Sequence, residues 1–186
     1  MIIQLALRSL PHSWGSILER VTEKLTDCRA VIAGGAIRDL LLGAEAVVKD
    51  LDIFVLGPGD KALQNLIESF GEPPGRRGVD DSPETYADGP VWRWPELRLT
   101  YDAPLIDLVA MGGVSSVAQL LDNFDIGLVQ AAHDGARYVI HDNFVEGIDR
   151  RIIRVINDSL PDNARGRAVR MAQKFPEFTV DLSVFQ

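Results

Sequence analysis

The spacing of hydrophobic and polar positions changes several times along the chain, which indicates alternating helices and strands. Apolar residues at helical spacing, as in WGSILERVTEKL (14–25), are typical of an amphipathic helix. Short apolar runs, such as RAVIA (29–33), are typical of buried strands. The pattern predicts helices at 14–25, 36–42, 61–70, 115–121 and 161–174, strands at 29–33, 51–56, 91–99, 104–111, 124–132 and 137–141, and a short apolar stretch at 152–156.

Turn-forming residues separate these segments. Asp60 is placed to cap the helix that follows it, and Asp134-Gly135 is typical of a hairpin turn. Pro161 is placed to open the last helix and Pro176 prevents its continuation. The segment 71–90, rich in proline, glycine and acidic residues, is predicted to be a loop.

No linker or internal repeat divides the chain. We therefore expect one α/β (α+β) unit, with a mixed β-sheet flanked by helices and a short C-terminal helical extension. The predicted catalytic part is 1–145, and the basic extension, 146–186, is expected to pack on it as a single structural unit.

The composition is that of a globular protein, with 186 residues, 46% of them hydrophobic and 25% charged. A single cysteine, Cys28, excludes an internal disulfide framework and a Cys-rich zinc module. The first fourteen residues are too short and too interrupted for a signal peptide or a membrane span. We expect a cytoplasmic protein without a membrane partner.

The charge is unevenly distributed. A formal net charge of −8 disfavours broad binding to nucleic acid, because phosphate contacts require a basic surface. Residues 148–174, however, carry seven basic and three acidic side chains. This basic segment is suited to one polyanionic ligand, although from charge alone a solvated helix face is the more ordinary explanation.

The most informative stretch is 31–55, VIAGGAIRDLLLGAEAVVKDLDIFV. A strand leads through Gly34-Gly35 into a helix, and glycines there allow the backbone to approach a phosphate closely. Asp50 and Asp52 open the next strand on one face, where two carboxylates favour a hard cation such as Mg²⁺ or Mn²⁺. Each motif by itself is weak, but the two in this order indicate phosphoryl or nucleotidyl transfer.

A third acid is expected to complete the metal site. Asp107 is the candidate, because it is the one charge within the apolar strand PLIDLVA. Pairing with Arg98 is the alternative explanation, and Asp102 is a rival candidate in a turn. Trp92 and Trp94, on either side of Arg93, suit either base stacking or an aromatic strand face.

The stretch VIAGGAIRDLLLG…VVKDLDIFV resembles the head domain of CCA-adding tRNA nucleotidyltransferases and bacterial poly(A) polymerases, in the DNA polymerase β-like superfamily. LIDLVA, NFDIGLVQAA and RAVRMA resemble later family motifs in the same order, so the similarity covers about residues 28–180. The resemblance implies the nucleotidyltransferase fold and metal binding by Asp50, Asp52 and Asp107. It implies that the nucleotide contacts Gly34, Gly35, Arg38, Asp39, Arg167 and Arg170.

The chain also departs from the family pattern. About two extra residues separate Gly35 from Asp50, and Arg165 is out of register. Asn123 and Phe124 replace two arginines that the family places before the residue matching Asp125. The neck, body and tail that in the family select CTP or ATP and hold tRNA have no counterpart in these 186 residues. We therefore expect no CCA addition by this chain alone.

The expected function is the transfer of a nucleoside monophosphate from an NTP to a hydroxyl, with release of pyrophosphate. An RNA 3′ end, a small molecule and a protein remain open as acceptors, and the oligomeric state is not predicted. The alternatives are a non-catalytic nucleotide-binding module of the same fold and a toxin-type nucleotidyltransferase that modifies tRNA or protein.

Overall fold

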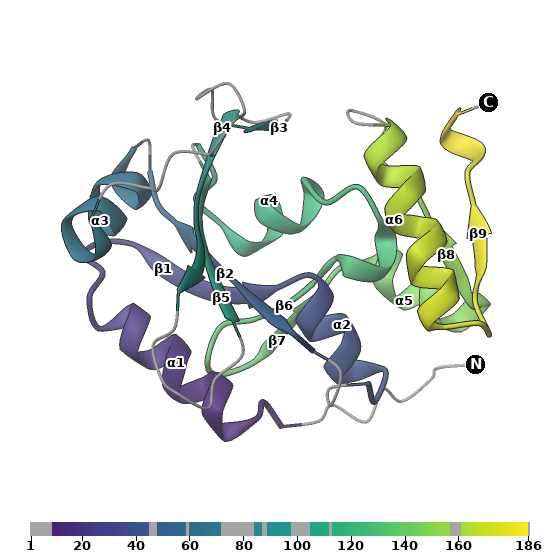
Figure 1. Cartoon of the computed structure of the whole chain (residues 1–186), viewed down its shortest axis with the longest axis horizontal. Helices are drawn as coiled ribbons and strands as arrows, with labels where there is room; N and C mark the ends of the chain where they lie inside the picture. The colour runs from purple at the N-terminus through teal and green to yellow at the C-terminus, as the bar shows by residue number, and fades with distance from the viewer. Residues whose placement is uncertain are drawn as a thin grey trace.

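The computed structural model describes residues 9–44, 48–58, 60–71, 84–86, 89–97, 105–111, 113–156 and 161–185, with backbone only for 84–86, 89–97 and 161–163. The elements in chain order (Figure 1) are α1 (His12–Thr22), β1 (Arg29–Ala33), α2 (Gly35–Leu41), β2 (Asp50–Leu56), α3 (Lys61–Phe70), β3 (Glu84–Tyr86), β4 (Gly89–Leu97), β5 (Leu105–Met111), α4 (Val117–Asp122), η2 (Gly127–Val129), β6 (Ala131–His133), β7 (Tyr138–Ile140), α5 (Asp142–Arg150), β8 (Ile152–Arg154), α6 (Pro161–Lys174), β9 (Thr179–Asp181) and η3 (Ser183–Phe185). None of the described helices is long and apolar enough to cross a membrane.

The main sheet is mixed, as predicted. The described strands follow the order β3-β4-β5-β2-β1-β6-β7. β2 and β5 run parallel, and the other neighbouring pairs in this sheet are antiparallel. Because β2 and β5 are neighbours in the sheet, their N-terminal ends, which carry the acidic motifs, lie side by side.

Alternation along the strands gives the sheet two apolar faces. Ile53 and Leu108 belong to the larger core cluster, which includes buried residues of α1, α2 and α3. Phe54 and Val109, one position further along, belong to a second cluster that includes buried residues of α4. Asp52 therefore shares the α4 face with Phe54, because residues two apart in a strand point the same way.

The C-terminal elements pack around their own apolar cluster. β8 pairs in parallel with β9, and α6 lies beside this small sheet at one side of the molecule (Figure 1). Ile126 and Leu128 join Ala168 and Met171 of α6 in one buried cluster. The predicted division between 145 and 146 falls inside α5, so the extension shares both a helix and a core with the rest.

An ion-pair network strengthens this packing. The Arg154 guanidinium donates to Asp181 at 3.0 Å and to Glu146 at 2.9 Å, so it connects β8 to β9 and α5. These hydrogen bonds, that to Asp181 first, raise the pKa of Arg154.

Several predicted elements need correction. Residues 124–132 do not form one strand, because 127–129 turn as a 3₁₀ helix and only Ala131–His133 enters the sheet. The predicted loop 71–90 contains β3 and the start of β4, which pair with each other. Asp60 stands at the N-cap of α3 without a capping hydrogen bond from its side chain. Helix α5 and strand β9 were not anticipated by the pattern.

Two helical glycines give opposite stability predictions. Intrinsic propensity favours alanine over glycine by about 1 kcal/mol in each helix. A Cβ at Gly147 of α5 would lie 2.9 Å from Leu128 Cδ2 and 3.0 Å from the Ile152 carbonyl oxygen, so overpacking outweighs that gain. A Cβ at Gly166 of α6 would meet only the flexible end of Arg170, at 3.4 Å.

We expect Gly147→Ala to lower the free energy of unfolding by about 1–2 kcal/mol. Gly166→Ala, the matched control, should raise it by up to about 1 kcal/mol. Urea denaturation of the two variants measures both changes. An equal gain in both would show that the packing around Gly147 is loose.

Candidate active site

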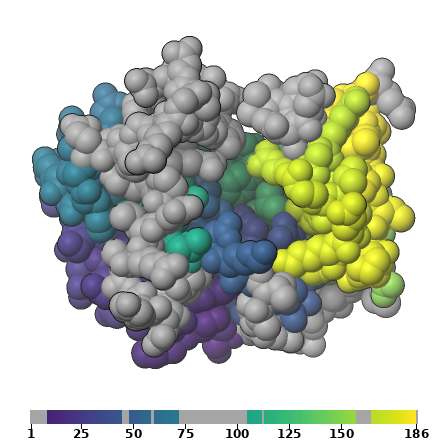
Figure 2. Space-filling model, viewed as in Figure 1, coloured from purple at the N-terminus to yellow at the C-terminus, as the bar shows by residue number. Residues whose placement is uncertain are grey.

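A cavity of about 550 Å³ lies between the α4 face of the sheet and helix α6. In Figure 2 the yellow surface of the C-terminal segment faces the blue surface of the N-terminal half across this hollow. The lining residues are Gly34, Gly35, Arg38, Asp50, Asp52, Phe54, Asp107, Val109, Met111, Phe124, Asp125, Ile126, Val129, Arg167, Arg170, Met171 and Lys174. All the predicted site residues except Asp39 are among them.

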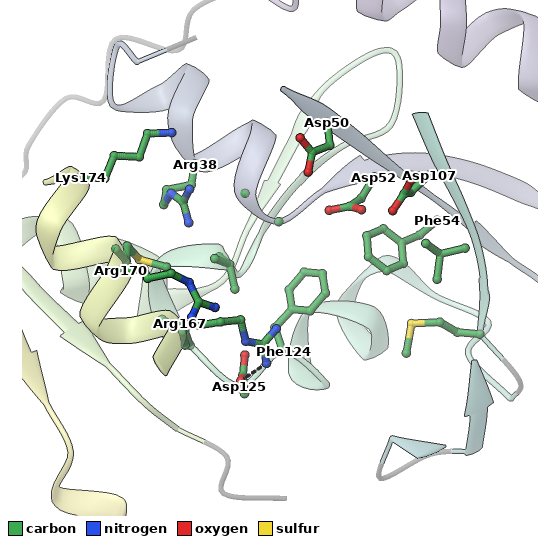
Figure 3. A pocket seen from close by; sticks show the side chains of 17 residues that line it. Arg38, Asp50, Asp52, Phe54, Asp107, Phe124, Asp125, Arg167, Arg170 and Lys174 are labelled. Carbon is green, nitrogen blue, oxygen red and sulfur yellow. Dashed lines mark hydrogen bonds and ion pairs between the residues drawn. The ribbon is translucent and has the colours of Figure 1, made fainter. Parts of the chain in front are cut away.

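The acidic side of the cavity is formed by the two parallel strands. Asp52 and Asp107 are direct partners in the β2–β5 register. Their carboxylates lie close together in Figure 3, and both side chains are half-buried. Asp50 stands two residues earlier on the same face of β2 and is exposed. The parallel register therefore brings together residues 55 positions apart in the sequence.

The donor set suits a hard divalent cation, with one limit. Carboxylate oxygens are the ligands that Mg²⁺ prefers, and Asp52 and Asp107 present two carboxylates from adjacent strands. Within the described residues, no group of three or more His, Cys, Asp or Glu side chains is arranged to hold a metal ion. Mg²⁺ is usually held by one or two protein carboxylates together with substrate phosphates and waters. Asp52 and Asp107 supply that number of protein carboxylates.

The glycine turn closes the cavity beside these acids. Gly34 has φ 80° and ψ −134°, a conformation that only glycine adopts readily, and its N–H donates to the Ala131 carbonyl at 3.0 Å. A Cβ at Gly34 would lie 3.9 Å from the tip of Phe124. The turn is thus fixed by its backbone conformation, with helix α2 beginning at Gly35.

The basic side of the cavity comes mainly from α6. Arg167, Arg170 and Lys174 are three and four residues apart, so they lie on one face of the helix. Arg38 of α2 adds a further cation (Figure 3). Within the described part of the chain, no ion pair involves Arg170, which is exposed. The cavity therefore has acids on the sheet and cations on the helices.

Asp39 has a different place from the one predicted. It does not line the cavity, although its neighbour Arg38 does. Its buried carboxylate accepts from Arg38 Nε at 2.8 Å and from Lys174 Nζ at 2.5 Å. Asp39 therefore connects α2 to α6 and holds two cavity cations, instead of lining the cavity itself.

Asp125 forms the second connection to α6. Its carboxylate pairs with the Arg167 guanidinium, and its side chain is largely buried. Arg167 Nε is itself buried without a hydrogen-bond partner among the described residues. The guanidinium that pairs with Asp125 thus comes from α6. Asn123 and Phe124, which stand where the family pattern has two arginines, have no guanidinium to offer.

Sequence reasoning missed the apolar part of the cavity. Phe54, Val109 and Met111 continue the faces of Asp52 and Asp107 along the same strands. Period-two alternation beyond each acid is the signal that identifies them. Phe124 and Lys174 were also missed, and only the spacing of α6 pointed to the lysine.

Three further hypotheses concern the strand next to β5. Arg98 and Asp102, the alternatives considered for Asp107, lie outside the described residues. In the register, Trp92 and Trp94 stand opposite Ala110 and Leu108, whereas Val109 of the cavity stands opposite Arg93. The side chains of Trp92 and Trp94 lie outside what the structure describes, so base stacking by them stays a prediction.

No protein-family model and no curated protein matches the sequence. Solved structures do match. A tRNA-processing enzyme in an apo form is 21% identical with a TM-score of 0.61, over 95% of this chain and 46% of that one. The Bacillus stearothermophilus CCA-adding enzyme in complex with CTP is 18% identical with a TM-score of 0.60, over 93% and 42%. The Thermotoga maritima CCA-adding enzyme complexed with tRNA is 18% identical with a TM-score of 0.60, over 97% and 42%.

These matches confirm the predicted nucleotidyltransferase fold. The chain spans less than half the length of each of these three structures. Over that part, it has the fold of tRNA-processing and CCA-adding enzymes.

Proposed function

We propose that this chain is a metal-dependent nucleotidyltransferase. It transfers a nucleoside monophosphate from an NTP to a hydroxyl, and the hydroxyl acceptor that the comparisons favour is an RNA end. The observation that carries the proposal is the register of Asp52 with Asp107, which sets two carboxylates on one wall of a cavity whose opposite wall is basic. Neighbours of this fold include enzymes solved with CTP and with tRNA.

The reaction breaks the phosphoanhydride bond between the α- and β-phosphates of the NTP and forms a phosphoester bond to the acceptor. The acceptor oxygen attacks the α-phosphorus, the bond to the β-phosphate oxygen breaks, and pyrophosphate leaves. Mg²⁺ or Mn²⁺ held by Asp52, Asp107 and, as a third predicted ligand, Asp50 would lower the pKa of the acceptor hydroxyl and neutralise phosphate charge. Asp107 would either accept the hydroxyl proton or hold the first metal ion, and its register position opposite Asp52 on the cavity wall supports this role.

The remaining residues bind and orient the nucleotide. Gly35, at the start of α2, would present its backbone to the phosphates, while Gly34, whose N–H donates to the Ala131 carbonyl, would let the chain turn close to them. Arg38, Arg170 and Lys174 would neutralise the negative charge of the phosphates. Positioning and charge neutralisation supply most of the rate in such reactions, because the protein has little covalent chemistry to perform. For this reaction, firmly positioned cations therefore matter more than a nucleophilic side chain of the protein.

Metal-dependent nucleotide binding tests the first part of the proposal. A ligand at a hundred times its Kd adds about 2.7 kcal/mol to the free energy of unfolding. For a chain of this size we expect ATP, GTP, CTP or UTP with Mg²⁺ to raise Tm by about 5–10 °C. The rise should disappear with EDTA and in Asp52→Asn/Asp107→Asn. No rise with any NTP and either metal would contradict nucleotide binding.

Label transfer tests the reaction itself. The chain is incubated with an RNA pool, Mg²⁺ and NTP labelled at the α- or the γ-phosphate. Nucleotidyl transfer predicts RNA labelled from the α-position only, with the γ-label released in pyrophosphate. Label from the γ-position would indicate phosphoryl transfer instead, and binding without any transfer would favour the non-catalytic nucleotide-binding module.

A further inference from the structure

Phe124 occupies the middle of the cavity. In Figure 3 its ring lies between the carboxylates of Asp52 and Asp107 and the Asp125–Arg167 pair. It meets Phe54 in an edge-to-face contact, with ring centroids 5.5 Å apart and an interplanar angle of 64°. An aromatic ring thus separates the acidic wall from the basic wall.

The apolar lining side chains that are only half-buried are Phe124 and Val129, and of these two only Phe124 has a flat aromatic face. Phe54, Val109 and Met111 are 7%, 0% and 4% exposed, so neighbouring side chains already cover them. Phe124 is only half-buried. Its contact with Phe54 supports the ring from one side, and its tip points toward Gly34, where an added Cβ would stand 3.9 Å away.

The lining side chains other than Phe124 offer little to a flat, uncharged part of a ligand, so stacking on the aromatic ring is the kind of recognition that remains. Among the described lining residues the side chains are either charged or apolar, with no Ser, Thr, Asn, Gln, Tyr or His. The charged ones suit phosphates and a metal ion. A nucleobase is planar and stacks on an aromatic face whatever its hydrogen-bonding edge.

We propose that Phe124 is the stacking platform for a nucleobase, that of the donor NTP. The inference rests on the proposed function. Residues two apart in a strand are about 7 Å apart, so Phe54 and the ring it supports lie one such step beyond Asp52. A base on Phe124 would then leave its phosphates between the acids and the cations of α6.

Stacking predicts weak selection among bases. Purines present a larger π-face than pyrimidines, so ATP and GTP should bind more tightly than CTP and UTP. Stacking is tolerant of the hydrogen-bonding edge, so with the charged lining residues engaged by the phosphates and the metal ion, ATP and GTP should differ little from one another.

The test compares nucleotide with tripolyphosphate, each with Mg²⁺, on three variants. Phe124→Leu should weaken ATP binding about 5- to 100-fold, the range for loss of one base stack, and leave tripolyphosphate binding within about twofold. Phe124→Trp should retain ATP affinity, and ATP should quench its added tryptophan fluorescence beyond that of the wild type. Phe185→Leu, outside the cavity, should bind ATP as the wild type does.

Each other result overturns the proposal. Equal weakening of ATP and tripolyphosphate would show that the ring only supports the cavity wall. Unchanged ATP affinity in Phe124→Leu, with a raised KM for the RNA acceptor, would assign the stacked base to the acceptor. If the wild type transfers label and Phe124→Leu keeps both its ATP affinity and its KM for the RNA acceptor, the stacking proposal is wrong and the proposed function stands. If the wild type binds no nucleotide, both fall.

Discussion

Asp52→Asn and Asp107→Asn are each expected to lower kcat for nucleotidyl transfer by about a hundredfold or more, the scale for loss of one well-placed electrostatic group. The two residues are register partners on adjacent parallel strands, and each is the one carboxylate at that position of its strand. Neither carboxylate can therefore take over the role of the other. Asparagine keeps the shape of aspartate but removes the negative charge that a divalent cation requires. Initial rates of α-label incorporation, with circular dichroism as the check on folding, measure the effect.

Two further variants sharpen this experiment. Asp60→Asn changes an exposed aspartate outside the cavity that makes no capping hydrogen bond, so its rate should equal that of the wild type. Asp50→Asn examines the exposed acid of the motif and should also lose activity if Asp50 is a metal ligand. Near-full turnover in Asp52→Asn would refute the assignment of the acidic pair.

The sequence predicted the elements whose patterns are purely local. β1, α3 and α6 begin and end where apolar spacing, Asp60 and Pro161 place them. Residues 124–132 were misassigned because an apolar run fits a strand or a buried turn equally well, and Gly127 fits tightly against Asn143 of α5. That contact joins segments that only the folded chain brings together.

In the candidate site, too, local sequence signals were readable and long-range contacts were not. Asp50, Asp52 and Gly34 were found because strand–turn–helix–strand order is a local signal, and Asp107 because a charge stands out in an apolar strand. Asp39 was assigned to the nucleotide, since nothing local shows that Lys174 lies 2.5 Å from its carboxylate across 135 residues. Phe124 was recorded as a departure from the family, and only the structure shows its ring in the cavity.

These long-range pairs explain how the cations are held in place. Asp39 takes hydrogen bonds from both Arg38 and Lys174, and Arg38 also lies over the Phe175 ring at 5.5 Å. A long side chain held by a buried carboxylate loses less freedom when a phosphate binds. Asp39 therefore positions two cations of a cavity that it does not line.

Asp39→Asn is expected to lower the free energy of unfolding by about 2–3 kcal/mol, less than a fully buried pair because Lys174 remains about a third exposed. The loss arises because two cations then share a neutral partner beside a buried guanidinium, Arg38 being 12% exposed. For a chain of this size, Tm should fall by about 4–12 °C. Lys174→Met leaves the Arg38–Asp39 pair intact and should cost less, while the exposed Asp149→Asn should cost little. Differential scanning calorimetry ranks the three, and a Lys174→Met loss exceeding that of Asp39→Asn would show that the lysine, rather than the carboxylate, holds α6 to α2.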